Sequence, residues 1–169
     1  MIPENEYNPY YKNYIQSIEK NGKSIVDSLY DSQAQFENIL RSLPKEKEGY
    51  AYAEGKWTIK ELIQHIIDTE RVFCYRAMSF ARNDKTSLPG FDQDIFVDNS
   101  FANTRDYNEL LDEMKTLRES TIQLFKSFSE DVLLRIGIGS GSNMSVRAIG
   151  YLFSGHQIHH LNIIEERYL

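Results

Sequence analysis

The apolar residues of this chain recur at steps of three and four, and this spacing restricts the fold more than any other feature. Between residues 23 and 43 the recurring positions are Val26, Leu29, Gln33, Phe36, Leu40 and Leu43, of which one is polar. Between residues 105 and 128 they are Tyr107, Leu110, Met114, Leu117, Thr121, Leu124 and Phe128. Residues at these steps share one face of an α-helix, so both segments are predicted to be helices with one face in a core.

A third helix has the clearest start signal. Thr58 is a suitable N-cap, and Glu61 three residues later completes a capping box, with Trp57 and Leu62 placed as a hydrophobic staple. The four prolines lie where helices should begin, end or be absent. Together these marks predict an all-α chain with helices near 9–20, 23–43, 58–82, 105–128 and 145–169.

Two long connections separate the predicted helices, one near 83–104 and one near 129–144. Loops of this length in a compact domain are usually functional or disordered. The first is too apolar for a solvated linker, so we expect it to pack on the helices; its large apolar residues are Leu88, Phe91, Ile95, Phe96, Val97 and Phe101. About 22 extended residues span up to ~73 Å, against ~37 Å for a 25-residue helix, so this loop could cross the whole bundle.

Composition narrows the classes of protein to consider. A length of 169 residues with 41% apolar residues suits one domain over residues 1–169. The net charge of −6, with no cluster of Lys and Arg, argues against a nucleic-acid partner. No apolar run reaches the ~20 residues of a membrane span, the first residues lack a signal-peptide pattern, and the single cysteine, Cys74, agrees with a reducing compartment. We therefore expect a cytoplasmic protein with no membrane contact.

Two histidines lie on one face of the last predicted helix. His156 is at the centre of its apolar stripe, and His160 follows one turn later, beside it. A single histidine in such a stripe is usually a core residue with one hydrogen bond, but two buried imidazoles without a shared partner cost ~1–3 kcal/mol each. A divalent cation removes this cost, because neutral imidazole is a preferred ligand of zinc, nickel, copper and iron.

Only one histidine, His65, lies outside that helix. It is seven residues after Thr58, about 10 Å into its helix, and His160 is about 13 Å from the end of its own helix. If the two helices run antiparallel, the three imidazoles reach the same level. Three protein ligands leave coordination positions open, as in catalytic metal sites. The spacing thus predicts one divalent ion, zinc, nickel or iron, held by His65, His156 and His160.

Four further residues are candidates for the same site. Asp68, one turn after His65, could orient a ligand or act as a base, although a paired or solvent-facing carboxylate is at least as plausible. Arg71 and Arg76 could bind an anionic substrate, although ion pairing is the commoner role. His159 points to the opposite flank of the stripe from His160, so it is predicted to face substrate or to pack against a neighbouring helix.

Three segments resemble the DinB superfamily of metal-binding four-helix bundles, and the resemblance extends through Leu169. They are GKWTIKELIQHIIDTERVFCYRAMSFAR, LPGFDQDIFV and GYLFSGHQIHHLNIIEERYL. The most specific parts of the resemblance are the histidine of the first segment and the closing H-x-x-H-H. In this family they imply metal ligation by His65, His156 and His160. The resemblance also implies an up-down-down-up four-helix bundle with a long crossover loop between its second and third helices, and a homodimer.

The family resemblance leaves the reaction open. The family includes transferases that use bacillithiol, mycothiol or glutathione-like thiols, members described as metal-dependent hydrolases, and members without a known reaction. One hypothesis is an enzyme whose metal activates a low-molecular-weight thiol, or water, toward a small-molecule substrate. The alternatives are a non-catalytic metal-binding stress-response protein and a bundle without a physiological metal.

Overall fold

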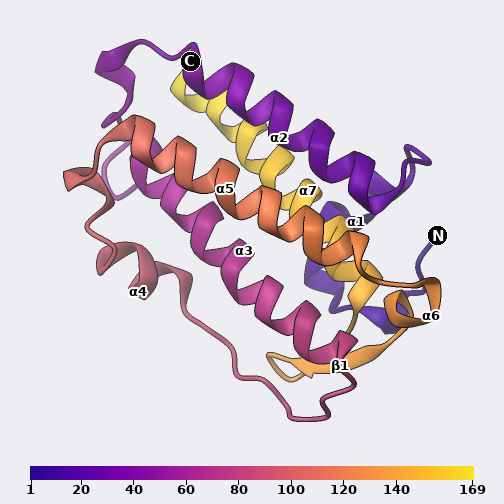
Figure 1. The fold of residues 1–169 in the computed structure, drawn as a ribbon. Coiled ribbons are helices and arrows are strands. Elements are labelled where there is room, and N and C mark those ends of the chain that lie inside the picture. Colours follow the sequence, from indigo (N-terminus) through magenta and orange to yellow (C-terminus); the bar gives the residue numbers. More distant parts are fainter.

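The computed structural model describes residues 1–169 and consists mainly of four long helices lying side by side (Figure 1). These are α2 (Ile25–Arg41), α3 (Ile59–Ala81), α5 (Tyr107–Lys126) and α7 (Val146–Ile163). The shorter elements are α1 (Lys12–Glu19), α4 (Gln93–Asp98), α6 (Glu130–Leu133), β1 (Ile136–Gly139) and β2 (Ser142–Ser145). Short 3-10 turns span Glu4–Glu6, Pro9–Tyr11, Lys45–Lys47 and Ala102–Thr104, and a π-helical turn spans Ile164–Tyr168. No helix is long and apolar enough to cross a membrane.

The long helices have the predicted up-down-down-up order. In Figure 1, α3 and α5 run in the same direction, and α2 and α7 run opposite to them. Each long helix packs against two others, α2 on α7 and α5, and α3 on α5 and α7. The parallel pair exists because the crossover, residues 82–106, returns along the outside of the bundle. Both the all-α four-helix fold and its long crossover are therefore confirmed.

The crossover packs on the bundle only in part. Leu88 and Val97 are buried, as expected, whereas the side chains of Ile95, Phe96 and Phe101 are 59%, 42% and 71% exposed. For the first two the reason is the short helix α4: Val97 faces α3, and its two predecessors are turned about 100° and 200° away from that face. The prediction was wrong for these three exposed residues.

The second connection contains a β-hairpin that periodicity did not predict. Strands β1 and β2 pair antiparallel with Gly139 opposite Ser142, and the two residues between them, Ser140 and Gly141, both have positive φ. Two such residues form the tight turn that matches the twist of a hairpin. Leu88 of the crossover donates to Ile138 O at 2.9 Å and accepts from Ser140 N at 3.0 Å. The hairpin thus anchors the crossover near the end of α3.

The start of α3, at the predicted capping box, is hydrogen-bonded to the turn that follows α7. Thr58 Oγ1 accepts from Glu61 N at 3.2 Å, and Glu61 Oε2 accepts from Thr58 N at 2.7 Å, so α3 begins at Ile59. The hydroxyl of Tyr168, in the π-helical turn after α7, donates to Trp57 O at 2.7 Å. This contact ties the end of α7 to the start of α3 and fixes the relative height of the two antiparallel helices.

The buried core consists of two apolar clusters with a polar layer between them. One cluster includes Leu29, Phe73, Ile122 and Leu152, and the other includes Phe36, Ile63, Met114 and Leu161. Each long helix contributes apolar residues to both clusters and has a buried polar residue between them. The polar layer contains one such residue from each helix, namely Ser32, Glu70, Arg118 and Gln157. The three predicted ligand histidines lie on α3 and α7 close to this layer.

The close approach of α1 to α7 gives a stability prediction. A Cβ added to Gly155 would lie 2.1 Å from the backbone oxygen of Tyr14. We expect Gly155→Ala to lower the free energy of unfolding by at least the ~1–3 kcal/mol of an overpacked core, because backbone atoms cannot move aside as a side chain can. Urea unfolding measures the loss. Gly49→Ala is the control, since a Cβ added to Gly49 would meet no atom within 4 Å; equal stability of the two variants would contradict the prediction.

Candidate metal centre

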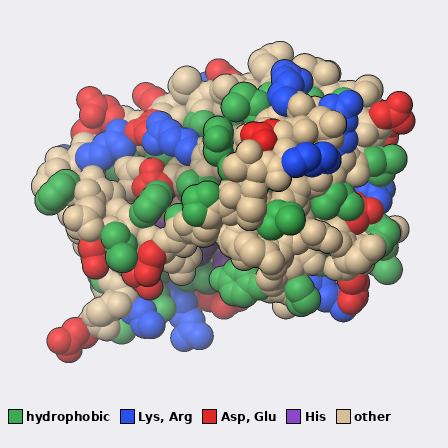
Figure 2. Space-filling model, turned by 90° about the horizontal axis from the view of Figure 1, so that it is seen from below, with side chains coloured by type: hydrophobic (Ala, Val, Ile, Leu, Met, Phe, Trp, Pro, Cys, Tyr) green, Lys and Arg blue, Asp and Glu red, His purple; other side chains and the backbone are tan.

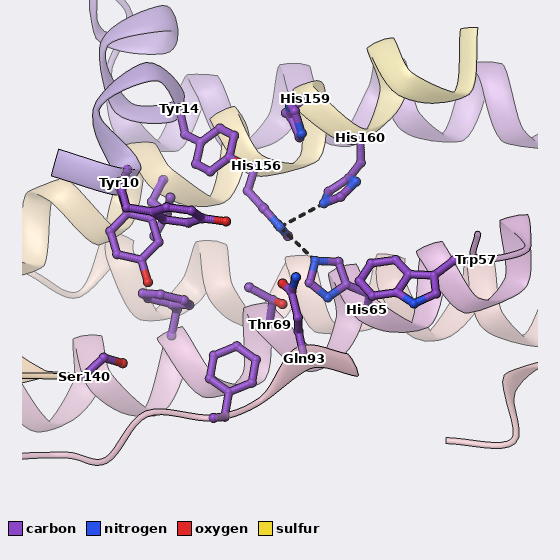
Figure 3. Close-up of a pocket in the computed structure, with 14 residues that line it drawn as sticks. Tyr10, Tyr14, Trp57, His65, Thr69, Gln93, Ser140, His156, His159 and His160 are labelled. Carbon is purple, nitrogen blue, oxygen red and sulfur yellow. Dashed lines mark hydrogen bonds between the residues drawn. The ribbon is translucent and has the colours of Figure 1, made fainter. Parts of the chain in front are cut away.

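The imidazoles of His65, His156 and His160 converge on one point between α3 and α7. His156 Nε2 lies 3.1 Å from His65 Nε2 and 3.1 Å from His160 Nε2. One ring nitrogen of each residue lies within 4.8 Å of the other two. Figure 3 shows the three rings pointing toward one another, with His156 between the other two. The structure therefore brings together the three residues that the spacing selected.

Neighbouring aromatic rings hold these imidazoles in place. The Trp57 ring lies 4.8 Å from the His65 ring, and the Tyr14 ring lies 5.8 Å from the His156 ring (centroid distances). Trp57 precedes the N-cap of α3 and is tied to the C-terminal turn through its carbonyl oxygen. The side chains of His65 and His160 are only 4% and 9% exposed. Packing therefore limits the rotation of the rings away from their meeting point.

The donor set suits a divalent cation. Each neutral imidazole carries one hydrogen, so three facing Nε2 atoms cannot all be satisfied by one another. The Nδ1 atom of His160 is buried without a hydrogen-bond partner, so no contact within the protein assigns the ring hydrogen to either nitrogen. With the ring hydrogens on Nδ1, the three facing Nε2 atoms would all be acceptors and would match the ligand type and number of an open zinc-like site.

Burial keeps the three imidazoles neutral. It lowers the pKa of His65 to about 4. Burial, followed by the charges of the neighbouring histidines, also holds the pKa values of His156 and His160 well below their ordinary range. Metal ligation requires the neutral form, so these side chains are in the binding-competent state at pH 7.

The lowered pKa values predict acid sensitivity of the metal-free protein. His65 titrates near 6.5 when unfolded and near 4 when folded, so between these values the unfolded chain binds more protons and stability falls as pH falls. At pH 4.5 this one residue lowers the free energy of unfolding by about 2–3 kcal/mol relative to pH 7. Urea unfolding in the presence of a chelator measures the loss, and His65→Asn should reduce it by that amount. An identical pH dependence in both proteins would contradict the assignment.

The histidines form one end of a cavity of about 320 Å³. In the space-filling view from below, histidine surface is visible only inside a hollow of the molecule (Figure 2). The cavity walls are largely aromatic, and no Asp, Glu, Lys or Arg lines them; the lining residues are Tyr10, Tyr11, Tyr14, Trp57, His65, Thr69, Phe73, Phe91, Gln93, Ser140, Leu152, His156, His159 and His160. The site can therefore admit a small molecule with an apolar body.

His159 lies on the cavity wall outside the group of three nitrogens. Its half-buried ring is 5.0 Å from the Tyr14 ring and 5.1 Å from the His160 ring. Asp68, the candidate base, does not line the cavity. It accepts from Gln64 Nε2 at 2.9 Å and lies 3.7 Å from Arg71 Nη1. Asp68 thus takes the paired role that the sequence analysis left open, because it faces α5 instead of α7.

The two candidate arginines differ in position. Arg71 pairs with Glu113 of α5 at 2.6 Å and lies outside the cavity. Arg76 is 2% exposed and lies directly behind the cavity wall, where its Nη2 donates to Pro89 O and to Ser140 Oγ, both at 2.8 Å. It therefore joins α3 to both the crossover and the hairpin.

Most residues of the cavity wall were not predicted from the sequence. Thr69 and Phe73 follow His65 by one and two helical turns, so the spacing that placed His65 could have identified them. Thr69 Oγ1 is buried without a partner. The N-terminal tyrosines, Tyr10, Tyr11 and Tyr14, carry no such signal, because they reach the cavity only through the packing of α1 on α7.

Comparisons with known proteins agree with this architecture. The model of the DinB superfamily matches residues 28–164. YfiT from Bacillus subtilis, described as a probable metal-dependent hydrolase with an unusual four-helix bundle topology, superimposes with a TM-score of 0.78 at 14% identity over 98% of this chain and 90% of that one. A mycothiol-dependent maleylpyruvate isomerase superimposes with a TM-score of 0.65 at 12% identity, over 81% of this chain and 58% of that one. No curated protein matches the chain.

Proposed function

The chain belongs to the DinB superfamily, and we propose that it is an enzyme in which His65, His156 and His160 hold one divalent metal ion, zinc, nickel or iron. The observation that carries this proposal is the convergence of three Nε2 atoms at the end of a cavity large enough for a small molecule. A metal with three protein ligands retains open coordination positions, and as a Lewis acid it lowers the pKa of a coordinated water or thiol.

Side chains of the cavity would bind the substrate and accept a proton. The aromatic walls exclude water and bind the apolar part of a substrate, which strengthens electrostatic interactions in the site. Burial lowers the pKa of His159, so its imidazole is neutral at pH 7 and can accept a proton from a thiol or water in the cavity. We therefore propose His159, and not Asp68, as the proton acceptor.

Two reaction classes follow from this arrangement, transfer of a low-molecular-weight thiol and hydrolysis. Of the proteins of similar fold, one is described as a probable metal-dependent hydrolase and one as a mycothiol-dependent maleylpyruvate isomerase, which supports a thiol as a candidate cosubstrate. An alternative is a non-catalytic metal-binding stress-response protein. The 4% exposure of His65 favours it, because a metal buried between α3 and α7 would also stabilise the bundle.

One set of assays separates these functions. Zinc-, nickel- and iron-loaded protein is incubated with an electrophile such as chlorodinitrobenzene together with bacillithiol, mycothiol or glutathione, and separately with nitrophenyl esters without thiol. The proposal predicts turnover in one arm that disappears on chelation and returns with metal. Absence of turnover in both arms, combined with a large drop in thermal stability on chelation, would support the stabilising role instead.

The assembly is a proposal that rests on the family resemblance, whereas the location and the kind of ligand are proposals that rest on composition and charge. We expect a homodimer, in the cytoplasm, whose ligands are small molecules and not nucleic acids. Light scattering after size-exclusion chromatography gives the mass in solution. A mass of 19.7 kDa would correspond to one chain and would contradict the dimer.

A further inference from the structure

We propose that the cavity binds a small carboxylate-bearing molecule. Its carboxylate accepts hydrogen bonds from the Tyr11 and Ser140 hydroxyls, close to the Arg76 guanidinium, and its other end lies at the metal. The position of the second end rests on the proposed function. Figure 3 shows Ser140 on the far side of the cavity from Trp57 and His160, so the two ends of the ligand are held by different elements.

The first observation is that Arg76 is a buried arginine without an acidic partner. It is 2% exposed, and its side-chain hydrogen bonds go to two neutral oxygen atoms, Pro89 O and Ser140 Oγ. The other fully buried arginine, Arg118, is paired with Glu70 at 2.7 Å. Buried arginines are normally paired, because an isolated charge in the interior is costly. Arg76 therefore leaves an uncompensated positive charge at the Ser140 end of the cavity, opposite the histidines (Figure 3).

The second observation is that the surroundings hold this guanidinium in place. Its Cζ atom lies 4.8 Å from the Phe73 ring centroid and 5.9 Å from that of Phe91. A Cβ added to Gly139 would lie 3.3 Å from Arg76 Nε, so the absence of a side chain at Gly139 makes room for the arginine. Phe73 and Phe91 line the cavity, which places the charge immediately behind its wall.

The third observation concerns the two hydroxyl groups between Arg76 and the cavity. Ser140 Oγ accepts from Arg76, so the hydroxyl hydrogen is free to point into the cavity that Ser140 lines. Burial raises the pKa of Tyr11, and the nearby Arg76 charge opposes that rise, so the phenol is a neutral donor at pH 7. Two hydroxyl donors backed by a cation suit a carboxylate, which accepts hydrogen bonds at both oxygens.

The remaining walls define the rest of the ligand. No carboxylate lines the cavity, so nothing competes for the Arg76 end. The body of the ligand must pass between aromatic side chains, including Tyr14, Phe73 and Phe91, which favours a flat or apolar skeleton. We infer a small aromatic or unsaturated carboxylate with a metal-binding donor at its opposite end.

Two probes that differ in a single group, a carboxylate in one and a carboxamide in the other, test this subsite. 3-Mercaptobenzoate and 3-mercaptobenzamide are titrated into the zinc-loaded full chain by calorimetry. We expect the carboxylate to bind about tenfold more tightly than the amide. Ser140→Ala and Arg76→Met should each bring the ratio close to one. Arg71→Met is the matched control, because it removes a positive charge from α3 outside the cavity and should keep the ratio. Circular dichroism and thermal unfolding confirm that each variant is folded.

The outcomes separate this inference from the metal proposal. Equal binding of the two probes by the unaltered protein, or a preference that survives both Ser140→Ala and Arg76→Met, would overturn the subsite. If zinc does not bind, the metal proposal fails, and the same comparison is made with benzoate and benzamide on the full chain. A preference for benzoate that Ser140→Ala removes would then still support the subsite, and equal affinities would overturn it.

Discussion

Replacement of His65 by alanine is expected to lower the affinity for a divalent metal by more than about 100-fold and to abolish metal-dependent activity. Loss of a residue that only supports a ligand typically costs 10–100-fold in metal affinity, and His65 is a proposed ligand itself. It is also the only histidine that α3 contributes to the site, so the two remaining imidazoles come from one helix. Competition with a chromophoric chelator measures the affinity.

Two control variants separate metal binding from folding. His159→Ala should keep the metal even if activity falls, because His159 lies outside the group of three nitrogens. Thr58→Ala removes the N-cap of α3 and should cost only about 1 kcal/mol of stability, with the metal retained. Equal loss of metal from His159→Ala and His160→Ala, in proteins shown to be folded, would mean that the ligand face of α7 is wrongly assigned.

Glu70→Gln is expected to lower the free energy of unfolding by about 3–5 kcal/mol, because it breaks a buried ion pair and leaves one charge behind. Glu70 accepts from Arg118 Nε and Nη2 at 2.9 and 2.7 Å. It also accepts from Thr121 Oγ1 at 2.7 Å. Arg118 is 0% exposed and also donates to Gln157 Oε1 at 2.9 Å. Loss of the carboxylate charge leaves this guanidinium buried and uncompensated.

An exposed ion pair provides the matched comparison. Arg41 and Asp112 approach to 2.7 Å with side chains 40% and 68% exposed, so Asp112→Asn should cost less than about 1 kcal/mol. The double variant Glu70→Leu with Arg118→Met should recover much of the loss, since removal of both charges leaves neither unpaired. Urea unfolding of the three proteins gives the comparison. A similar loss for Glu70→Gln and Asp112→Asn would contradict the importance of the buried network.

Local signals in the sequence predicted the helices, whereas their up-down-down-up order was implied by the family resemblance and only permitted by the length of the crossover. Apolar steps of three and four placed the long helices, and the capping box placed the start of α3 at Thr58. The hairpin Ile136–Ser145 has no comparable signal, because its strands have four residues each and depend on the tight turn and on pairing with Leu88. The exposed residues of α4 were misassigned because apolar content alone does not state which face of a short helix meets the bundle.

The site was predictable to a similar extent. Two histidines one turn apart on α7 predicted a shared metal, and His65 is the only histidine outside that helix. Asp68 was harder to place, because three residues along a helix leave it about 60° from His65, enough to turn it toward α5. Neither Glu70 nor Arg118 was predicted to be buried, because the stripe predicted for residues 105–128 passes through Leu117, whereas the buried face of α5 passes through Arg118. Glu70 and Arg118 meet only because α3 packs on α5, and the sequence does not specify which helix faces pack together.

The most direct test of the metal centre is titration of the tag-free protein with Co²⁺, followed by visible absorption spectroscopy. The three-histidine site predicts saturation at one ion per chain, with the d–d bands of a four- or five-coordinate complex, and a new thiolate charge-transfer band when a small thiol is added. His65→Ala should show neither feature. No saturable binding, or a bound ion whose spectrum does not respond to an added thiol or other small ligand, would contradict an open metal site at these histidines.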